Sequence, residues 1–341
     1  MFLQEKEIIF DWYMPAESEL HAATWMALGH SRAIWGKELL VSVQKNIFEL
    51  ANTISAFEPV NLLVTKTNYD YAQKNISNRV NLIVAEFDDI WLRDTGPVFV
   101  KNHQKQLGAI NFKFNGWGNK QSFSLDATVA NLLSQYTQAH AIQTPLTLEG
   151  GNIDVDGEET ALMAESCTFI DNRNPNLNKI TCESILKKYC GIKKVIWLPG
   201  IAAKEITDGH IDGYARFICP GIVALHYSDY PNWENELSHL HLKLLKNALD
   251  AAGRKLKVIT FPKPKKARQL ICDDHFCSSY INFYFCNNAL IMPEFGDAQA
   301  DKTALSKMRE LFPKREIVQL NIDAIASGGG GIHCITQQQP V

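Results

Sequence analysis

The spacing of hydrophobic residues predicts an amphipathic helix over residues 35–57. Apolar side chains there recur every three or four positions, which places them on one face of a helix. Next come short apolar runs, whose length is typical of buried strands. Between them lies a more polar segment with helical spacing. These elements are a strand at 60–65, a helix at 69–78 and a strand at 80–85.

The same alternation of strands and helices recurs along the chain in units of about 60 to 70 residues, which predicts an α/β fold with internal repetition. No Pro/Ser-rich linker separates the units, so we expect a single catalytic domain over residues 1–341. The later elements are a strand at 109–114 with a helix from 125, strands in 149–163 with a helix at 179–189 and a strand at 194–198, strands in 213–225 with a helix at 233–252 and a strand at 257–261, and strands in 280–292 with a helix at 299–311 and a strand at 317–320.

Composition places the chain among ordinary globular proteins, with 46% hydrophobic and 21% charged residues. The segment Met1–Phe10 lacks the basic and apolar regions of a signal peptide, and no run approaches the roughly 20 apolar residues of a membrane span. The eight cysteines show no paired framework. We therefore expect reduced thiols, a cytoplasmic location and no membrane partner.

Charge argues against a nucleic-acid partner, because the net charge is -3 and the pI is about 6.4. One basic cluster exists at Lys263, Lys265, Lys266 and Arg268. Prolines interleave it, and we interpret it as a solvated loop.

The first candidate for chemistry is the segment 88–97, where three acids, Trp91 and Arg93 follow an apolar strand. A carboxylate such as Asp94 beside an indole suits a bound cation. A capped turn with a surface ion pair is the competing interpretation. A second segment, 148–152, places Glu149 before two glycines, which permit close backbone approach to a ligand or simply form a hairpin turn.

The third candidate is the segment 207–213, which contains His210 and Asp212. On an extended chain, residues two apart face the same side. The pair could then act as a general acid/base and a guanidinium anchor, or form a satisfied surface pair. A metal site would need further ligands nearby, which the sequence does not supply.

Four consecutive glycines at 328–331 precede Cys334 and a polar Thr/Gln run. Such a loop suggests backbone held close to something, or a gate, and favours a reactive thiol over an inert buried one. No Lys-Ser or Lys-Thr follows, so a phosphate loop is not expected. The other cysteine cluster, 272–277, fits no standard metal-ligand spacing.

Together and in order, these motifs resemble those of the agmatine deiminases, which are grouped with the bacterial peptidylarginine deiminases in the guanidino-group modifying superfamily. The similarity runs almost from end to end. The matching segments are 14–17, 23–25, 91–97, 114–118, 149–152, 208–212, 279–284 and 329–340.

The resemblance implies a five-bladed α/β propeller (the pentein fold) around a central site. It implies that Cys334 attacks the guanidinium carbon, that Asp94 and Asp212 hold the guanidinium, and that His210 transfers protons. Glu149 is a further acidic contact, and Trp91 lines the pocket. No metal or organic cofactor is implied, and a homodimer fits the family.

The implied substrate is a small guanidino compound, with agmatine favoured, in putrescine (polyamine) biosynthesis. Trp117 and Tyr214 are candidates for contacting its far end. An arginine or peptidylarginine substrate would call for cations near the site, and only Arg93 and Arg216 stand close to the motifs. A deiminase for another guanidino compound, an amidase with a Cys-His-Asp triad and a non-catalytic binder of cations are the alternatives.

Overall fold

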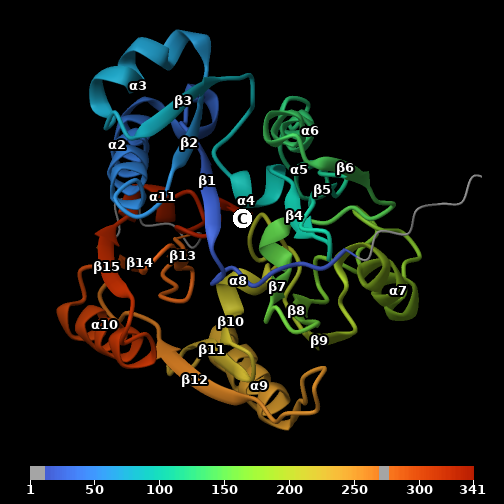
Figure 1. Ribbon diagram of the computed structural model, residues 1–341. Coiled ribbons are helices and arrows are strands. Elements are labelled where there is room, and N and C mark those ends of the chain that lie inside the picture. Colours follow the sequence, from blue (N-terminus) through green and yellow to red (C-terminus); the bar gives the residue numbers. More distant parts are fainter. Residues whose placement is uncertain (1–11, 269–275) are drawn as a thin grey trace, which may run out of the picture.

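The computed structural model describes residues 12–268 and 276–341. The N-terminal segment Met1–Phe10 and residues 272–275 of the second cysteine cluster therefore lie outside the described residues. The described strands form five separate sheets, one of four strands and four of three. Figure 1 shows these sheets arranged around a common centre, close to which the C-terminus lies.

Strand pairing follows one rule in all five sheets. In each three-stranded sheet, the middle strand pairs antiparallel with one neighbour and parallel with the other. The strands are β4 (Val98–Lys101), β5 (Leu107–Asn111) and β6 (His140–Gln143); β7 (Asp154–Val155), β8 (Thr160–Ala164) and β9 (Lys194–Leu198); β10 (Ala215–Cys219), β11 (Ile222–Tyr227) and β12 (Lys257–Pro262); β13 (Tyr284–Cys286), β14 (Ala289–Glu294) and β15 (Glu316–Asn321).

The four-stranded sheet joins the two ends of the described chain. β16 (Gln337–Pro340) pairs antiparallel with β1 (His21–Ala27), which pairs parallel with β2 (Val60–Val64), and β3 (Val80–Val84) follows in parallel. The first three of these strands repeat the pairing of the other sheets. The internal repetition predicted from element order is therefore confirmed at the level of strand pairing.

Each parallel pair is connected by a helix, because parallel neighbours need a long crossover. The crossover helices are α2 (Lys37–Ile54), α3 (Tyr69–Asn75), α6 (Asp126–Thr137), α7 (Lys179–Cys190), α9 (Trp233–Asn247) and α10 (Ala298–Leu311). The remaining helices are short: α1 (Arg32–Trp35), η1 (Lys66–Asn68), α4 (Leu92–Thr95), α5 (Gly116–Asn119), η2 (Gly150–Asn152), α8 (Ile211–Tyr214) and α11 (Asp323–Ala326).

The helix α7 shows how local sequence sets element bounds. It begins where the Asn178 side chain accepts a hydrogen bond from the backbone N–H of Thr181, which satisfies one of the free donors of the first turn. It ends at Gly191, whose φ of 70° suits a residue without a Cβ. Cys182 and Leu186, four positions apart, are buried on the same face.

Most predicted elements are confirmed, with three differences. The predicted helix 233–252 ends at Asn247, because Leu249 instead forms a bridge with Lys255. The strand predicted at 109–114 lies two residues earlier, at β5. Strands β1, β6 and β16 were not predicted. The Gln-rich run is a strand rather than a polar setting for the thiol, and its Gln339 accepts a hydrogen bond from the Trp25 indole.

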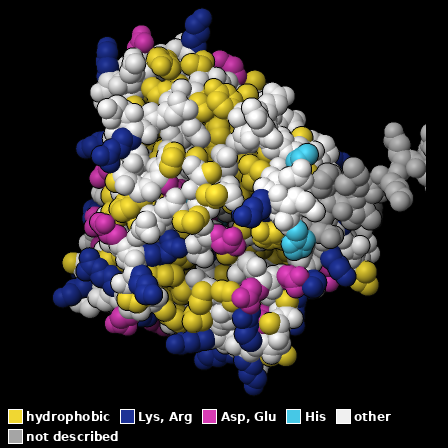
Figure 2. All heavy atoms as spheres, viewed as in Figure 1, with side chains coloured by type: hydrophobic (Ala, Val, Ile, Leu, Met, Phe, Trp, Pro, Cys, Tyr) yellow, Lys and Arg dark blue, Asp and Glu magenta, His cyan; other side chains and the backbone are white. Residues whose placement is uncertain are grey.

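None of the described helices is long and apolar enough to cross a membrane. On the face shown in Figure 2, many Lys and Arg side chains stand toward the edge, and hydrophobic side chains gather in the middle with a few charged ones among them. In the basic cluster at 263–268, Lys265, Lys266 and Arg268 are exposed, as expected of a solvated loop. Lys263 forms an ion pair of 2.6 Å with Glu234, and Arg268 one of 2.8 Å with Asp323.

Candidate active site

Asp94 is held with both carboxylate oxygens pointing to N–H donors. It lies on the helical turn α4, buried at 7% exposure. The backbone N–H of Gly151 donates to Oδ1 at 2.9 Å, and the indole N–H of Trp117 donates to Oδ2 at 2.9 Å. Burial raises the pKa of Asp94, with His210 acting against that rise. The close approach of Gly151 explains the glycine in the 148–152 motif.

His210 and Asp212 do not lie on an extended chain, so the reason given for their proximity is wrong. His210 caps the helical turn α8, on which Asp212 lies. The two side chains nevertheless converge beside Gly151. A Cβ added to Gly151 would lie 2.6 Å from His210 Nδ1 and 3.3 Å from Asp212 Oδ2. Backbone curvature at this turn, rather than strand alternation, brings them to one side.

His210 stands between two carboxylates. Its Nδ1 lies 3.7 Å from Asp94 Oδ2, and its Nε2 lies 3.5 Å from Glu149 Oε2. Burial alone would lower the pKa of His210, but the charge of Asp94 and the proximity of Glu149 raise it to about 9. The ring is therefore an imidazolium near neutral pH and can donate a proton.

Glu149 lies behind His210 rather than among the residues that line the cavity. It is fully buried, and its Oε1 accepts a hydrogen bond of 2.7 Å from Arg173 Nε. Burial opposes ionisation, but His210 and Arg173 together lower the pKa of Glu149. Arg173 also binds Asp208 at 2.8 Å. Sequence reasoning missed Arg173, since nothing in its local sequence marks it.

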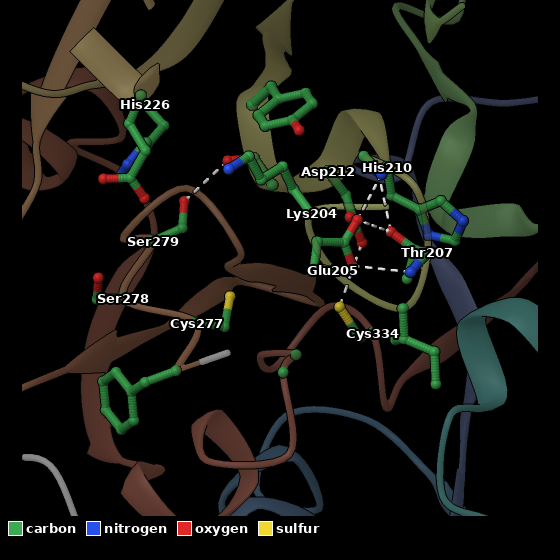
Figure 3. A pocket seen from close by; sticks show the side chains of 18 of the residues that line it. Lys204, Glu205, Thr207, His210, Asp212, His226, Cys277, Ser278, Ser279 and Cys334 are labelled. Atoms are coloured by element: carbon green, nitrogen blue, oxygen red, sulfur yellow. Dashed lines mark hydrogen bonds between the residues drawn. The ribbon is translucent and has the colours of Figure 1, made fainter. Parts of the chain in front are cut away.

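Cys334 presents its sulfur to Asp212 and Asn282. The Sγ atom lies 3.5 Å from Asp212 Oδ2 and 3.3 Å from Asn282 Nδ2, and Figure 3 shows the Cys334 thiol turned toward Asp212. Burial, and after it the charge of Asp212, raise the pKa of Cys334 well above its ordinary value. The resting residue is thus a thiol.

The site surrounds a cavity of about 170 Å³, a volume on the scale of engineered cavities that hold a small ligand. Trp91, Trp117 and Tyr214 line it together with Asp94, His210, Asp212 and Cys334. Figure 3 shows Lys204, His226 and Ser279 on the wall away from the thiol. The structure thus brings every predicted site residue except Glu149 to one cavity wall.

The glycine loop is packed against indole rings. A Cβ on Gly330 would overlap the ring of Trp91, and one on Gly328 would overlap the ring of Trp35. Asp89 fixes both rings, because it accepts hydrogen bonds from the two indole N–H groups at 2.8 and 2.9 Å. The expectation that this backbone is held close to something is confirmed.

The two arginines near the motifs are structural. Arg93 contacts Glu17 and Gln338, and Arg216 contacts Glu17 and Asp154, all within the buried interior. Cys277, from the second cysteine cluster, lines the cavity. Within residues 12–268 and 276–341, no group of three or more His, Cys, Asp or Glu side chains is placed to hold a metal ion.

The chain is similar to known proteins over almost its whole length. A protein of Legionella pneumophila is 36% identical over 334 residues, covering 97% of this chain and 95% of its own. The agmatine deiminase of Medicago truncatula is 33% identical, covering 100% and 99%. The structure of the agmatine deiminase of Enterococcus faecalis has a TM-score of 0.91 at 31% identity, covering 97% and 96%.

A more distant structure, an amidinotransferase from Microseira wollei, shares the fold alone, with a TM-score of 0.57 at 11% identity. The sequence profile of the Porphyromonas-type peptidyl-arginine deiminases matches residues 13–340. That match spans nearly the whole chain and every motif of the cavity. The chain therefore belongs to the Porphyromonas-type peptidyl-arginine deiminase family.

Proposed function

We propose that this protein is an agmatine deiminase, which hydrolyses agmatine to N-carbamoylputrescine and ammonia in putrescine biosynthesis. Relatives from Medicago truncatula and Enterococcus faecalis carry that name. The observation that carries the proposal is the convergence of Cys334, His210 and two carboxylates on one cavity, with the thiol 3.5 Å from Asp212. A planar cation between Asp94 and Asp212 would stand within reach of the sulfur.

In the mechanism we propose, the guanidinium binds between Asp94 and Asp212, and its positive charge offsets the carboxylates that suppress the Cys334 thiolate. The Cys334 thiol then loses its proton to solvent, and the resulting thiolate attacks the guanidinium carbon. His210 gives its own proton to the departing ammonia. A thiouronium intermediate remains on Cys334. His210, now neutral, takes a proton from water as that water attacks the same carbon, which releases the ureido product and the thiol.

The charges on the cavity wall support a substrate with a cationic far end. Among the described lining residues, Asp94, Glu205, Asp212 and Glu234 are acidic, and Lys204 is the only Lys or Arg. An arginine or peptidylarginine substrate would bring a carboxylate or carbonyl groups toward this acidic wall. The two arginines offered by the motifs are already bound by buried carboxylates. Agmatine, which has an amine and no carboxylate, fits these charges better.

We also propose that the five sheets are the blades of a five-bladed α/β propeller and that residues 1–341 form one catalytic domain. The repeated strand pairing supports this proposal, as does a site whose residues come from several sheets. Residues on α4, on α8 and after β15 meet at the centre. A homodimer remains our expectation, which light scattering of the purified protein would measure.

The test is release of ammonia and of a ureido product from agmatine, arginine and a peptidyl-arginine substrate, with Cys334→Ala as control. Release from agmatine alone, abolished in the variant, is the expected result. Release from arginine or the peptide would keep the mechanism but overturn the substrate. Release from none of them would favour a non-catalytic binder, and turnover of amides without a ureido product would favour an amidase.

A further inference from the structure

A buried histidine connects the substrate anchor Asp212 to the N-terminal segment of the chain. His333 Nδ1 lies 2.7 Å from Asp212 Oδ2, and His333 Nε2 lies 2.8 Å from Glu17 Oε2. All three side chains are buried, with 7% exposure or less. The three residues are far apart in sequence and come together only at the centre of the fold.

Each ring nitrogen of His333 faces a carboxylate oxygen. An ionised carboxylate only accepts hydrogen bonds, so the ring is the donor in its contact with Asp212. Burial disfavours the ionised form of Glu17, but Arg216 and His333 beside it lower the pKa of Glu17 well below its ordinary value. The His333 hydrogen bond likewise lowers the pKa of Asp212 against the effect of burial. Both partners are thus carboxylates, and each lies within hydrogen-bond distance of one ring nitrogen of His333.

Glu17 is itself held in one place by several donors. Its Oε2 accepts from Arg216 Nη2 at 2.9 Å and from Arg93 Nη2 at 3.2 Å, in addition to His333. Its Oε1 accepts the backbone N–H of Phe285 at 2.8 Å. A carboxylate fixed by three donors besides the ring gives His333 a rigid point of attachment.

Asp212, by contrast, has few other restraints. Its Oδ2 contacts His333 and the Cys334 sulfur, and within the described part of the chain its Oδ1 has no hydrogen-bond partner. It lies on a helical turn of four residues and precedes Gly213, where an added Cβ would meet open space. Without His333, the carboxylate could rotate about its side-chain bonds at little cost.

We propose that His333, anchored by Glu17, is a positioning residue that fixes the Asp212 carboxylate so that Oδ1 faces the guanidinium while Oδ2 faces the nucleophile. This inference rests on the proposed function. His333 directly precedes Cys334, and its backbone N–H is held by Asn282 Oδ1 at 2.9 Å. One short segment therefore sets both the sulfur and the carboxylate, and with them the distance that the attacking atom must cover.

The test uses two variants that each retain one of the two donors. The amide nitrogen of Asn stands as many bonds from the backbone as Nδ1 of His, and that of Gln as many as Nε2. His333→Asn can still donate to Asp212, whereas His333→Gln can still donate only to Glu17. We expect His333→Gln to have a kcat/KM for agmatine about 10- to 100-fold below that of His333→Asn, mainly through kcat.

The positioning role would be overturned if His333→Gln were as active as His333→Asn, or more active. If His333 were merely structural, the activities of the two variants would follow their stabilities alone. Thermal unfolding of both proteins measures those stabilities. Glu17→Gln is a second variant, with about tenfold lower kcat expected from a less firmly held ring. An unchanged kcat in folded Glu17→Gln would contradict the anchoring by Glu17.

The failure of the proposed function would look different. In that case the unmodified protein itself would release no ammonia from agmatine. Agmatine dissociation constants of Cys334→Ser, Cys334→Ser/His333→Asn and Cys334→Ser/His333→Gln would then decide the positioning role. Weaker binding in the Gln form than in the Asn form is the expected order. Equal binding, or binding by none of the three, would overturn the role.

Discussion

His210 Nε2 lies 3.5 Å from Glu149 Oε2, and both side chains are buried. Glu149 is one of the three carboxylates, with Asp94 and Asp212, that raise the pKa of His210 to about 9 against the effect of burial. In the proposed mechanism the imidazolium protonates the leaving ammonia. This form is present below that pH and is lost as the pH rises through about 9.

Glu149→Gln removes one of these charges, so the pKa of His210 should fall. We expect the ionisation near pH 9 in the profile of kcat/KM against pH to move to lower pH by about one unit. The measurement is the agmatine rate from pH 6 to 10. Glu159→Gln, at an exposed ion pair with Lys193, is the matched control, and an unmoved ionisation in Glu149→Gln would show that the carboxylate does not act on His210.

Asp212→Asn should raise the reactivity of the Cys334 thiol and lower the rate of agmatine turnover. Asp212 is the nearest charge that raises the pKa of Cys334, so its neutralisation lowers that pKa and makes the thiolate more abundant. Alkylation of Cys334 by iodoacetamide at pH 8 should become several-fold faster, by about one decade per unit of pKa. Agmatine turnover should fall by at least about a hundredfold with the loss of the anchor.

The two readouts need separate assays. Mass spectrometry of the Cys334 peptide distinguishes its alkylation from that of Cys277, which lines the same cavity. Slower alkylation in Asp212→Asn would mean that the carboxylate helps to ionise the thiol, contrary to the electrostatics described above.

Trp117→Phe removes the indole N–H that donates to Asp94 Oδ2 at 2.9 Å. A hydrogen bond to a charged group contributes about 1.5 to 3 kcal/mol, so kcat/KM for agmatine should fall about tenfold or more. Trp197→Phe is a close control, because it removes an indole donor to Glu183 at 2.7 Å away from the cavity. Equal activity of the two variants would remove Trp117 from the support of Asp94.

Gly151→Ala places a methyl group among the polar atoms of the site. Its Cβ would lie 2.6 Å from His210 Nδ1 and 2.9 Å from Asp94 Oδ1, so both side chains must move. Displacements of this size cost about a hundredfold in rate. Gly29→Ala, where the Cβ would meet only apolar side chains at 3.2 Å or more, should retain activity. Nearly full activity of Gly151→Ala would contradict the geometry of this site.

Regular elements with strong hydrophobic periodicity were predictable from sequence. The helix α2 buries Leu40, Val43, Ile47, Leu50 and Ile54 on one face. The spacing of these apolar residues in the sequence predicted the helix. β16 is the opposite case. Its sequence, Gln-Gln-Gln-Pro, has no apolar alternation, and only pairing with β1 makes it a strand.

The site divides in the same way. Asp94, His210, Asp212 and Cys334 stand in unusual local sequences, so they could be found before the structure was known. Glu17, Arg173 and His333 act through partners that are distant in the chain. No local pattern specifies such contacts, because they arise from how the sheets close around the centre. Glu149 was found, but its place behind His210 required the fold.

The pairing of β1 with β16 has a consequence for protein synthesis. The contact between Trp25 and Gln339 joins residues 314 positions apart, so a ribosome must translate almost the whole chain before these strands can meet. Pairings this remote form slowly. Cys334 lies just before β16 in the chain. Nascent chains that have not yet reached this strand therefore lack the pairing of β1 with β16 and a positioned Cys334. We expect deiminase activity only after residue 340 has been translated.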